Sequence, residues 1–96
     1  MKTLDQLKTI LAMQKPELMK KYHVKELGVF GSYVRGDERQ TSDLDVMVDF
    51  EKPIGLDFVT LADELESVLG VKVDLVSANA VKPRMMESIK EELVYV

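Results

Sequence analysis

The sequence predicts an α/β domain in which a small mixed β-sheet is packed with helices. Segments with apolar residues at helical spacing alternate with short, valine-rich segments along the chain. Glycine or proline stands at several of the boundaries between them. The 96 residues are 46% hydrophobic and 31% charged, which is typical of a folded domain with its own core. We therefore expect one domain over residues 1–96.

The first segment is expected to be a helix that begins after Thr3, a typical N-cap residue. Because proline has no amide hydrogen, we expect an interruption at Pro16, followed by a second short helical turn up to about Tyr22. The apolar residues of the first part fall on one face: Leu4, Leu7, Ile10 and Leu11.

Two strands are expected in the middle of the chain, at residues 25–30 and 43–50. A short helix around residues 33–35 lies between them and ends at Gly36. The polar residues 37–42 then predict a loop before the second strand.

The second half predicts a helix, a strand and a final helix. Residues 56–69 have helical spacing and end at Gly70, and residues 71–76 predict the third strand. Pro83 is expected to open the last helix. Its core-facing residues are expected to be Met86, Ile89 and Leu93.

Composition excludes several classes of function. The chain has no cysteine, which excludes disulfides, cysteine–zinc sites and a cysteine nucleophile. Its one histidine leaves little scope for a histidine metal cage or a Ser-His-Asp triad, and its net charge of −4 disfavours stable nucleic-acid binding. No apolar run approaches the roughly 18 residues of a membrane span, and Asp5 and Lys8 interrupt any signal-like stretch. We expect a cytoplasmic protein.

Two aspartates open the second predicted strand. Since side chains alternate along a strand, Asp43 and Asp45 share one face, opposite Leu44, Val46 and Val48. Neighbouring carboxylates repel one another, so such a pair requires a proton or a cation. Magnesium, a hard cation that prefers oxygen ligands, suits this pair.

Asp74 is a lone acid within the otherwise mostly apolar third strand. If this strand lies beside the second, Asp74 converges with Asp43 and Asp45. Three carboxylates in that position can hold two metal ions roughly 3.5–4 Å apart, as phosphoryl chemistry requires.

Gly31 and Ser32 stand where the first strand ends and the short helix begins. Glycine permits close approach of an anion, the helix start offers amide hydrogens, and the serine adds a hydroxyl. This corner is therefore a candidate phosphate site. The sequence has neither a Walker A loop nor a dinucleotide fingerprint.

Residues 31–45, GSYVRGDERQTSDLD, resemble the GS…DxD signature of the DNA polymerase β-like nucleotidyltransferase superfamily. Ten residues separate the GS pair from the first aspartate, and Asp74 matches the third acid of that superfamily. Arg35, Gly36 and Ser42 resemble the minimal nucleotidyltransferase (MNT) branch, whose members are single domains of similar length.

This resemblance implies a site and a reaction. Asp43, Asp45 and Asp74 would ligate two Mg²⁺ ions (Mn²⁺ is an alternative), with Asp74 also a candidate base. Gly31 and Ser32 would hold the β- and γ-phosphates of ATP. MNT proteins are typically paired with a HEPN-domain ribonuclease toxin and act as its antitoxin, by transferring AMP to a tyrosine of the toxin.

Two alternative functions stay open. The chain could neutralise its partner by stoichiometric binding alone, or transfer a nucleotide to a small-molecule acceptor. The intact set of acids favours catalysis, and the small size of the chain disfavours a pocket for a small acceptor. The negative net charge disfavours transfer to an RNA end.

Five charged residues have open roles. Arg35 is a candidate triphosphate ligand, and the alternative is an ion pair that fixes the short helix. Arg39 lies in the loop near the acids, where a solvated position is the alternative to a role at the site. Asp49 shares the face of the acids, and it is expected to pair with a basic side chain, with a metal ligand as the alternative. Lys82 and Arg84 open the last helix, where contact with the toxin or the nucleotide is the alternative to a solvated position.

Overall fold

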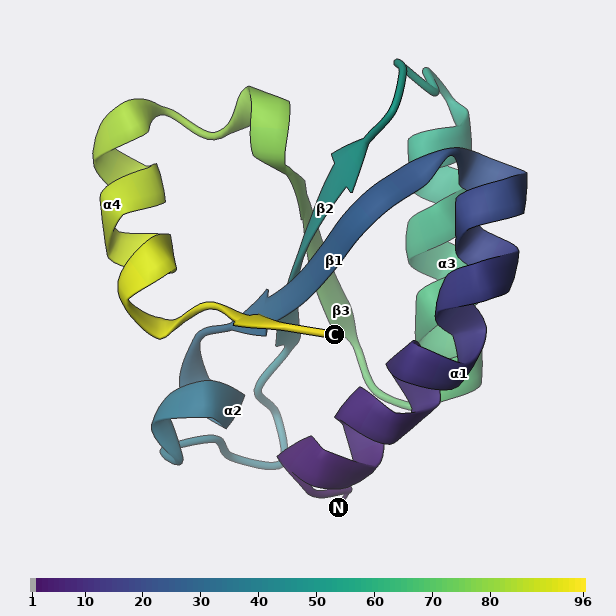
Figure 1. The fold of residues 1–96 in the computed structure, drawn as a ribbon. Coiled ribbons are helices and arrows are strands. Elements are labelled where there is room, and N and C mark those ends of the chain that lie inside the picture. Colours follow the sequence, from purple (N-terminus) through teal and green to yellow (C-terminus); the bar gives the residue numbers. More distant parts are fainter. Residues whose placement is uncertain (1) are drawn as a thin grey trace.

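The structure, a computed structural model, describes residues 2–96. Two long helices cover one face of a four-stranded sheet, and a third helix lies on the other side (Figure 1). The elements are α1 (Leu4–Tyr22), β1 (Val24–Phe30), α2 (Ser32–Arg35), β2 (Leu44–Phe50), α3 (Asp57–Leu69), β3 (Val73–Ser77), η1 (Ala78–Ala80), α4 (Pro83–Glu92) and β4 (Val94–Tyr95).

The sheet has the strand order β3-β2-β1-β4. Strand β1 runs antiparallel to β2 and β4, whereas β2 and β3 are parallel, with α3 as the crossover between them. This arrangement confirms the predicted α/β class with a mixed sheet. The parallel pair is the feature that later brings the acids together.

The core fills the space between the sheet and helices α1 and α3. Leucines at helical spacing on both helices meet the branched side chains of β2, and all of these residues are 0% exposed. They are Leu7, Leu11 and Leu18 of α1, Leu61, Leu65 and Leu69 of α3, and Leu44, Val46 and Val48 of β2.

The predicted interruption at Pro16 is wrong, because α1 continues through it from Leu4 to Tyr22. The fixed φ of proline fits a helix, and its cost is one lost hydrogen bond and local crowding. Leu18 and Tyr22, beyond the proline, are buried in the core, and their burial offsets that cost. The helix ends at His23, which adopts a left-handed conformation with φ 57°.

The C-terminal part holds α4 and a strand that the sequence did not predict. Helix α4 buries a single residue, Ile89, against the sheet. Strand β4 pairs with Gly28 and Val29 of β1, and a Cβ on Gly28 would lie 2.8 Å from Leu93 Cδ1. The absence of a side chain at Gly28 therefore leaves room for Leu93 where β4 pairs with β1.

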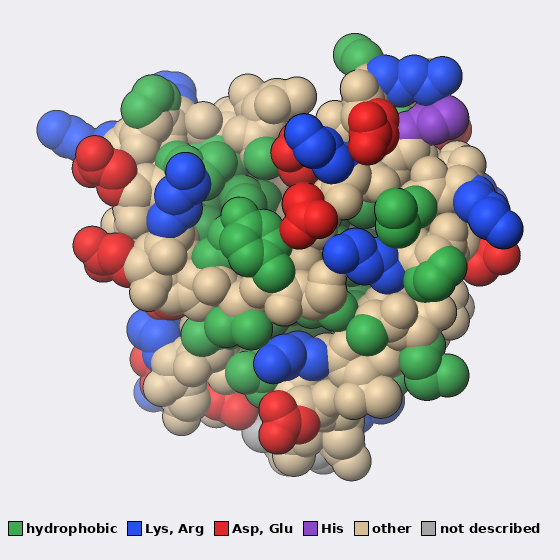
Figure 2. Space-filling view, viewed as in Figure 1, with side chains coloured by type: hydrophobic (Ala, Val, Ile, Leu, Met, Phe, Trp, Pro, Cys, Tyr) green, Lys and Arg blue, Asp and Glu red, His purple; other side chains and the backbone are tan. Residues whose placement is uncertain are grey.

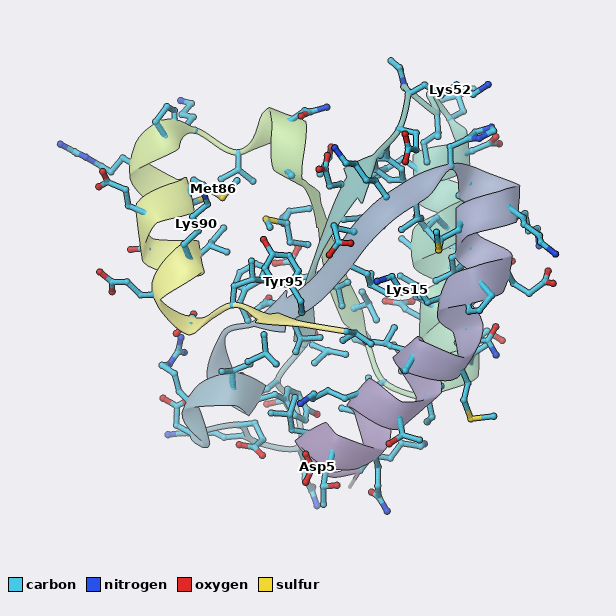
Figure 3. All side chains as sticks on the ribbon, viewed as in Figure 1. Asp5, Lys15, Lys52, Met86, Lys90 and Tyr95 are labelled. Atoms are coloured by element: carbon cyan, nitrogen blue, oxygen red, sulfur yellow. The ribbon has the colours of Figure 1, made fainter. Side chains whose placement is uncertain are left out.

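The last residue is also tied to α1, because Lys15 Nζ donates to the Val96 carbonyl at 2.8 Å (Figure 3). No helix within residues 2–96 is both long enough and apolar enough to cross a membrane.

Candidate active site

The three aspartates singled out in the sequence lie together on the sheet. The parallel register places Asp45 of β2 directly opposite Asp74 of β3. Asp43 precedes Asp45 by two residues, at the entrance to the same strand. Asp45 is half-buried, whereas Asp43 and Asp74 are exposed. The acids therefore face away from the leucine core, at an edge that solvent and ligands can reach.

Their proximity is visible in the electrostatics of the site. Burial, followed by the negative charges of Asp74 and Asp43, raises the pKa of Asp45 to about 6. The positive charge of Arg35 acts in the opposite direction but is the weakest of these influences. Near neutral pH, the negative charges of the cluster therefore repel one another, and a bound cation would reduce this repulsion.

Three carboxylates fit magnesium in donor type and in charge. Within residues 2–96, however, no three acidic, histidine or cysteine side chains are already gathered as a metal-ligand set. The acids are neighbours, and their side chains must turn toward a common point to ligate an ion. The donor chemistry therefore fits, while the ligand geometry is not preformed.

A sharp turn at Gly31 brings α2 next to the acids. Gly31 has φ 83° and ψ −153°, a conformation open essentially to glycine alone. A side chain here would overlap the Asp45 carboxylate, so glycine is also required by space. Ser32, the first residue of α2, follows directly. The structure thus places the Gly31–Ser32 turn against the carboxylate cluster.

Glu92, at the end of α4, contacts this turn from the other side. Its Oε1 accepts a hydrogen bond from the Gly31 amide at 3.0 Å. Arg35 Nη1 donates to both carboxylate oxygens of Glu92, at 3.2 and 3.1 Å, and Arg35 Nε donates to Asp37 at 3.3 Å. These two acids raise the pKa of the Arg35 guanidinium. Of the two roles considered for Arg35, the structure shows the ion pair.

Sequence reasoning missed Glu92. It stands beside Glu91 in a charged helix end, so no pattern in the sequence distinguishes the two. Only the pairing of β4 with β1 carries the end of α4 to the site. The signal is therefore tertiary and could not be read from local spacing.

The remaining charged candidates lie outside the cluster. Asp49 lines a separate cavity of about 200 Å³ between α4 and the sheet, together with Lys90 and other residues (Figure 3). Arg39 and Arg84 are exposed, and Lys82 lines an apolar groove beside β3. None of these four residues contributes to the arrangement around Asp45.

Two surface features lie near the site. A hollow of about 780 Å³ beside the start of β2 is lined by Gln6 of α1, Ser42 and Lys72 among others, but by none of the three acids. Hydrophobic side chains are also visible between α4 and the sheet (Figure 2). Because Asp43 and Asp74 are exposed, a large partner can reach the acids.

Comparison with known proteins gives a consistent result. Residues 11–96 match the family model of the nucleotidyltransferase domain. A protein named protein adenylyltransferase MntA, from Thermococcus cleftensis, is 44% identical over 97 residues, which cover 100% of this chain and 98% of the relative.

Solved structures share the fold. That of a provisionally assigned minimal nucleotidyltransferase has a TM-score of 0.73 and 37% identity, covering 92% of this chain and 93% of the other. The complex of a tri-AMPylated HEPN toxin with an MNT antitoxin from Shewanella oneidensis contains a chain with a TM-score of 0.67. That chain is 18% identical, with 93% of this chain and 70% of the other covered, so it shows likeness of fold alone.

Proposed function

Since this chain belongs to the nucleotidyltransferase domain family, we propose that it transfers AMP from ATP to a hydroxyl group of a partner protein. Membership of the family confirms the resemblance seen in the sequence. The observation that carries the proposal is the parallel register of Asp45 and Asp74, beside the Gly31–Ser32 turn. Carboxylates and a phosphate corner in contact are what nucleotidyl transfer needs.

The residues divide the work as follows. Ser32, at the start of α2, binds the β- and γ-phosphates, and Gly31, whose amide is held by Glu92, has no side chain and lets them approach closely. Together they place the α-phosphate over the carboxylates. Asp43, Asp45 and Asp74 would hold Mg²⁺, two ions in the full arrangement. Bound there, magnesium would neutralise charge that develops on the transferred phosphate and would make the acceptor hydroxyl more acidic.

Asp74 is exposed and lies on the edge strand β3, where an acceptor can approach. We assign it as the base that accepts the proton of the acceptor hydroxyl. The acceptor oxygen forms a bond to the α-phosphorus, the bond between that phosphorus and the α–β bridging oxygen breaks, and pyrophosphate leaves.

We propose a HEPN-domain toxin as the partner, with a tyrosine as the acceptor. The support is the fold shared with an MNT antitoxin that binds an AMPylated HEPN toxin. The open site also favours an acceptor that brings its own surface, because a large interface supplies the positioning that this small chain lacks. A tyrosine side chain is long and rigid, and its phenol is easier to deprotonate than an alcohol.

The test is a transfer assay with ATP labelled at the α-phosphate, Mg²⁺ and the cognate HEPN partner. We expect label on the partner, and loss of transfer in Asp43→Ala, Asp45→Ala and Asp74→Ala, each folded by circular dichroism. Asp49→Ala is the matched control, since Asp49 lies on the same strand and face as Asp45 but outside the cluster.

Two results would contradict the proposal. Transfer of a γ-label would indicate a kinase. Silencing of the partner at equal strength by the Asp43→Ala, Asp45→Ala double variant would show that stoichiometric binding, and not catalysis, is the function. Label on a small alcohol in place of the protein would replace the acceptor class and leave the nucleotidyl transfer intact.

A further inference from the structure

Glu92 connects two parts of the molecule that are far apart in sequence. It is the last residue of α4, and its carboxylate reaches the turn between β1 and α2. One oxygen accepts from both the Gly31 amide and Arg35 Nη1, and the other accepts from Arg35 Nη1 as well. The side chain of Glu92 is 24% exposed, so these contacts are shielded in part from water.

One of the two groups that Glu92 holds lies against the carboxylate cluster. Gly31 has Asp45 on its Cα side and Glu92 at its amide, so the turn is fixed between two acids. Arg35, the other group, is the last residue of the short helix α2 that begins directly after this turn. Any movement of Glu92 therefore changes both the position of the turn and the direction of the guanidinium.

Helix α4 has few apolar contacts of its own. Ile89 is its one buried residue, Met85 is 61% exposed, and the pairing of β4 with β1 holds the chain just after the helix. Charge-assisted hydrogen bonds are the stronger class of hydrogen bond and impose a direction that apolar contact does not. Through Glu92, the end of α4 is thus attached to the Gly31–Ser32 turn, the candidate phosphate site.

We propose that Glu92 is a positioning residue for nucleotide binding. It acts through Gly31 and Arg35: it fixes the Gly31–Ser32 turn against Asp45 and holds the guanidinium at the corner that receives the triphosphate. This inference rests on the proposed function, and it adds the C-terminal helix to the machinery that binds ATP.

The test compares binding of Mg-ATP to the full chain and to three variants by calorimetry. Glu92→Ala loses both contacts, and we expect binding weakened about tenfold, the equivalent of ~1.4 kcal/mol. Glu92→Gln keeps an oxygen for the Gly31 amide but loses the charge that holds Arg35, so its loss is smaller. Glu91→Gln is the matched control, with the same chemical change one residue away at an exposed position, and binds as the unmodified chain does.

A second measurement separates positioning from general stability. In transfer assays, we expect Glu92→Gln to raise KM for ATP with little change in kcat, and its thermal unfolding to stay close to that of Glu91→Gln. In an Arg35→Gln background, the effect of Glu92→Gln is expected to disappear, because the group it orients is gone.

Three outcomes would overturn the inference. Tighter ATP binding by Glu92→Ala would mean that the carboxylate competes with phosphate for Arg35. Unchanged binding by both Glu92 variants would exclude any role, and an effect that persists without Arg35 would exclude the route through it. An unmodified chain that binds no Mg-ATP would instead refute the proposed function itself.

Discussion

The two faces of the sheet differ in how many residues they bury and in the charge of their side chains. On one face, α1 and α3 bury leucines that are 0% exposed. On the other, α4 buries only Ile89, and the neighbouring surface carries the carboxylates and the Gly31 turn. Strand β2 serves both faces, because Leu44 and Val46 point into the core while Asp45 between them points to the site. The comparison teaches that buried leucines on one face stabilise the fold, whereas neighbouring carboxylates on the other face repel one another and destabilise it.

The largest effect should come from the leucine face. We expect Leu65→Ala to lower the free energy of unfolding by about 2–5 kcal/mol, since Leu65 is 0% exposed and its loss leaves a cavity. Urea denaturation measures this change, and Mg-ATP binding to the folded fraction should not alter.

Ile89→Ala is the counterpart on the α4 face. Ile89 is 5% exposed but packs on one side only, so we expect a smaller loss of stability. If the two variants unfolded at the same urea concentration, the faces would be equally packed and the comparison would fail.

The second prediction concerns two glycines with a positive φ. Gly31 and Gly36 have φ of 83° and 85° but ψ of −153° and 14°, and of the two only Gly31 has a neighbour that a methyl group would meet, the Asp45 carboxylate. We expect each alanine variant to lose about 1–3 kcal/mol from backbone strain. Gly31→Ala should in addition abolish nucleotide transfer, because Asp45 must move.

Gly36→Ala is therefore the control for placing alanine at a positive φ. A Gly31→Ala variant that transfers AMP as well as Gly36→Ala does would show that the turn and the carboxylate are not coupled. Both variants should be compared at a temperature where circular dichroism shows them to be folded.

The third prediction is a dependence of stability on pH in metal-free buffer. The folded-state pKa of Asp45, about 6, lies above its ordinary value of 3.8. The folded state thus binds the proton more tightly, and stability falls as the pH rises from about 4 to about 6, then levels off. Solvent screening of this partly exposed group reduces the change to about 1 kcal/mol.

Asp45→Asn should remove this pH dependence and melt higher than the unmodified chain at pH 7 without metal. Mg²⁺ should raise the melting temperature of the unmodified chain more than that of the variant. Identical pH profiles for the two proteins would show that the titration of Asp45 does not cause the dependence of stability on pH.

Local patterns were enough to predict much of this molecule. The alternation in β2 predicted the faces of Asp45 and Leu44, and Gly70 was correctly expected to end α3. The string from Gly31 to Asp45 resembled the nucleotidyltransferase signature, and the match to the family model confirms that resemblance. These features depend on residues close together in the sequence, so they can be predicted from one sequence without knowledge of the fold.

Features that depend on distant partners could not be predicted. The continuation of α1 past Pro16 requires burial of Leu18 and Tyr22, which only the folded core provides. Strand β4 is too short for a period to be seen, and its partner β1 is more than sixty residues away. Glu92 follows from that pairing, so it stayed hidden for the same reason.

The smallest effect should come from the start of α1. Thr3 Oγ1 accepts from the Gln6 amide at 3.2 Å, and Gln6 Oε1 accepts from the Thr3 amide at 2.9 Å, which completes a capping box. We expect Thr3→Ala to cost about 0.5–1 kcal/mol, because the contact is exposed and water replaces part of it. Thr3→Ser keeps the hydroxyl and should be close to neutral in urea denaturation. Since α1 covers the face opposite the acids, ATP affinity should stay unchanged in both variants. A measurable loss of affinity in Thr3→Ala would show that the two faces are coupled through the sheet, against the separation of stability and chemistry drawn above.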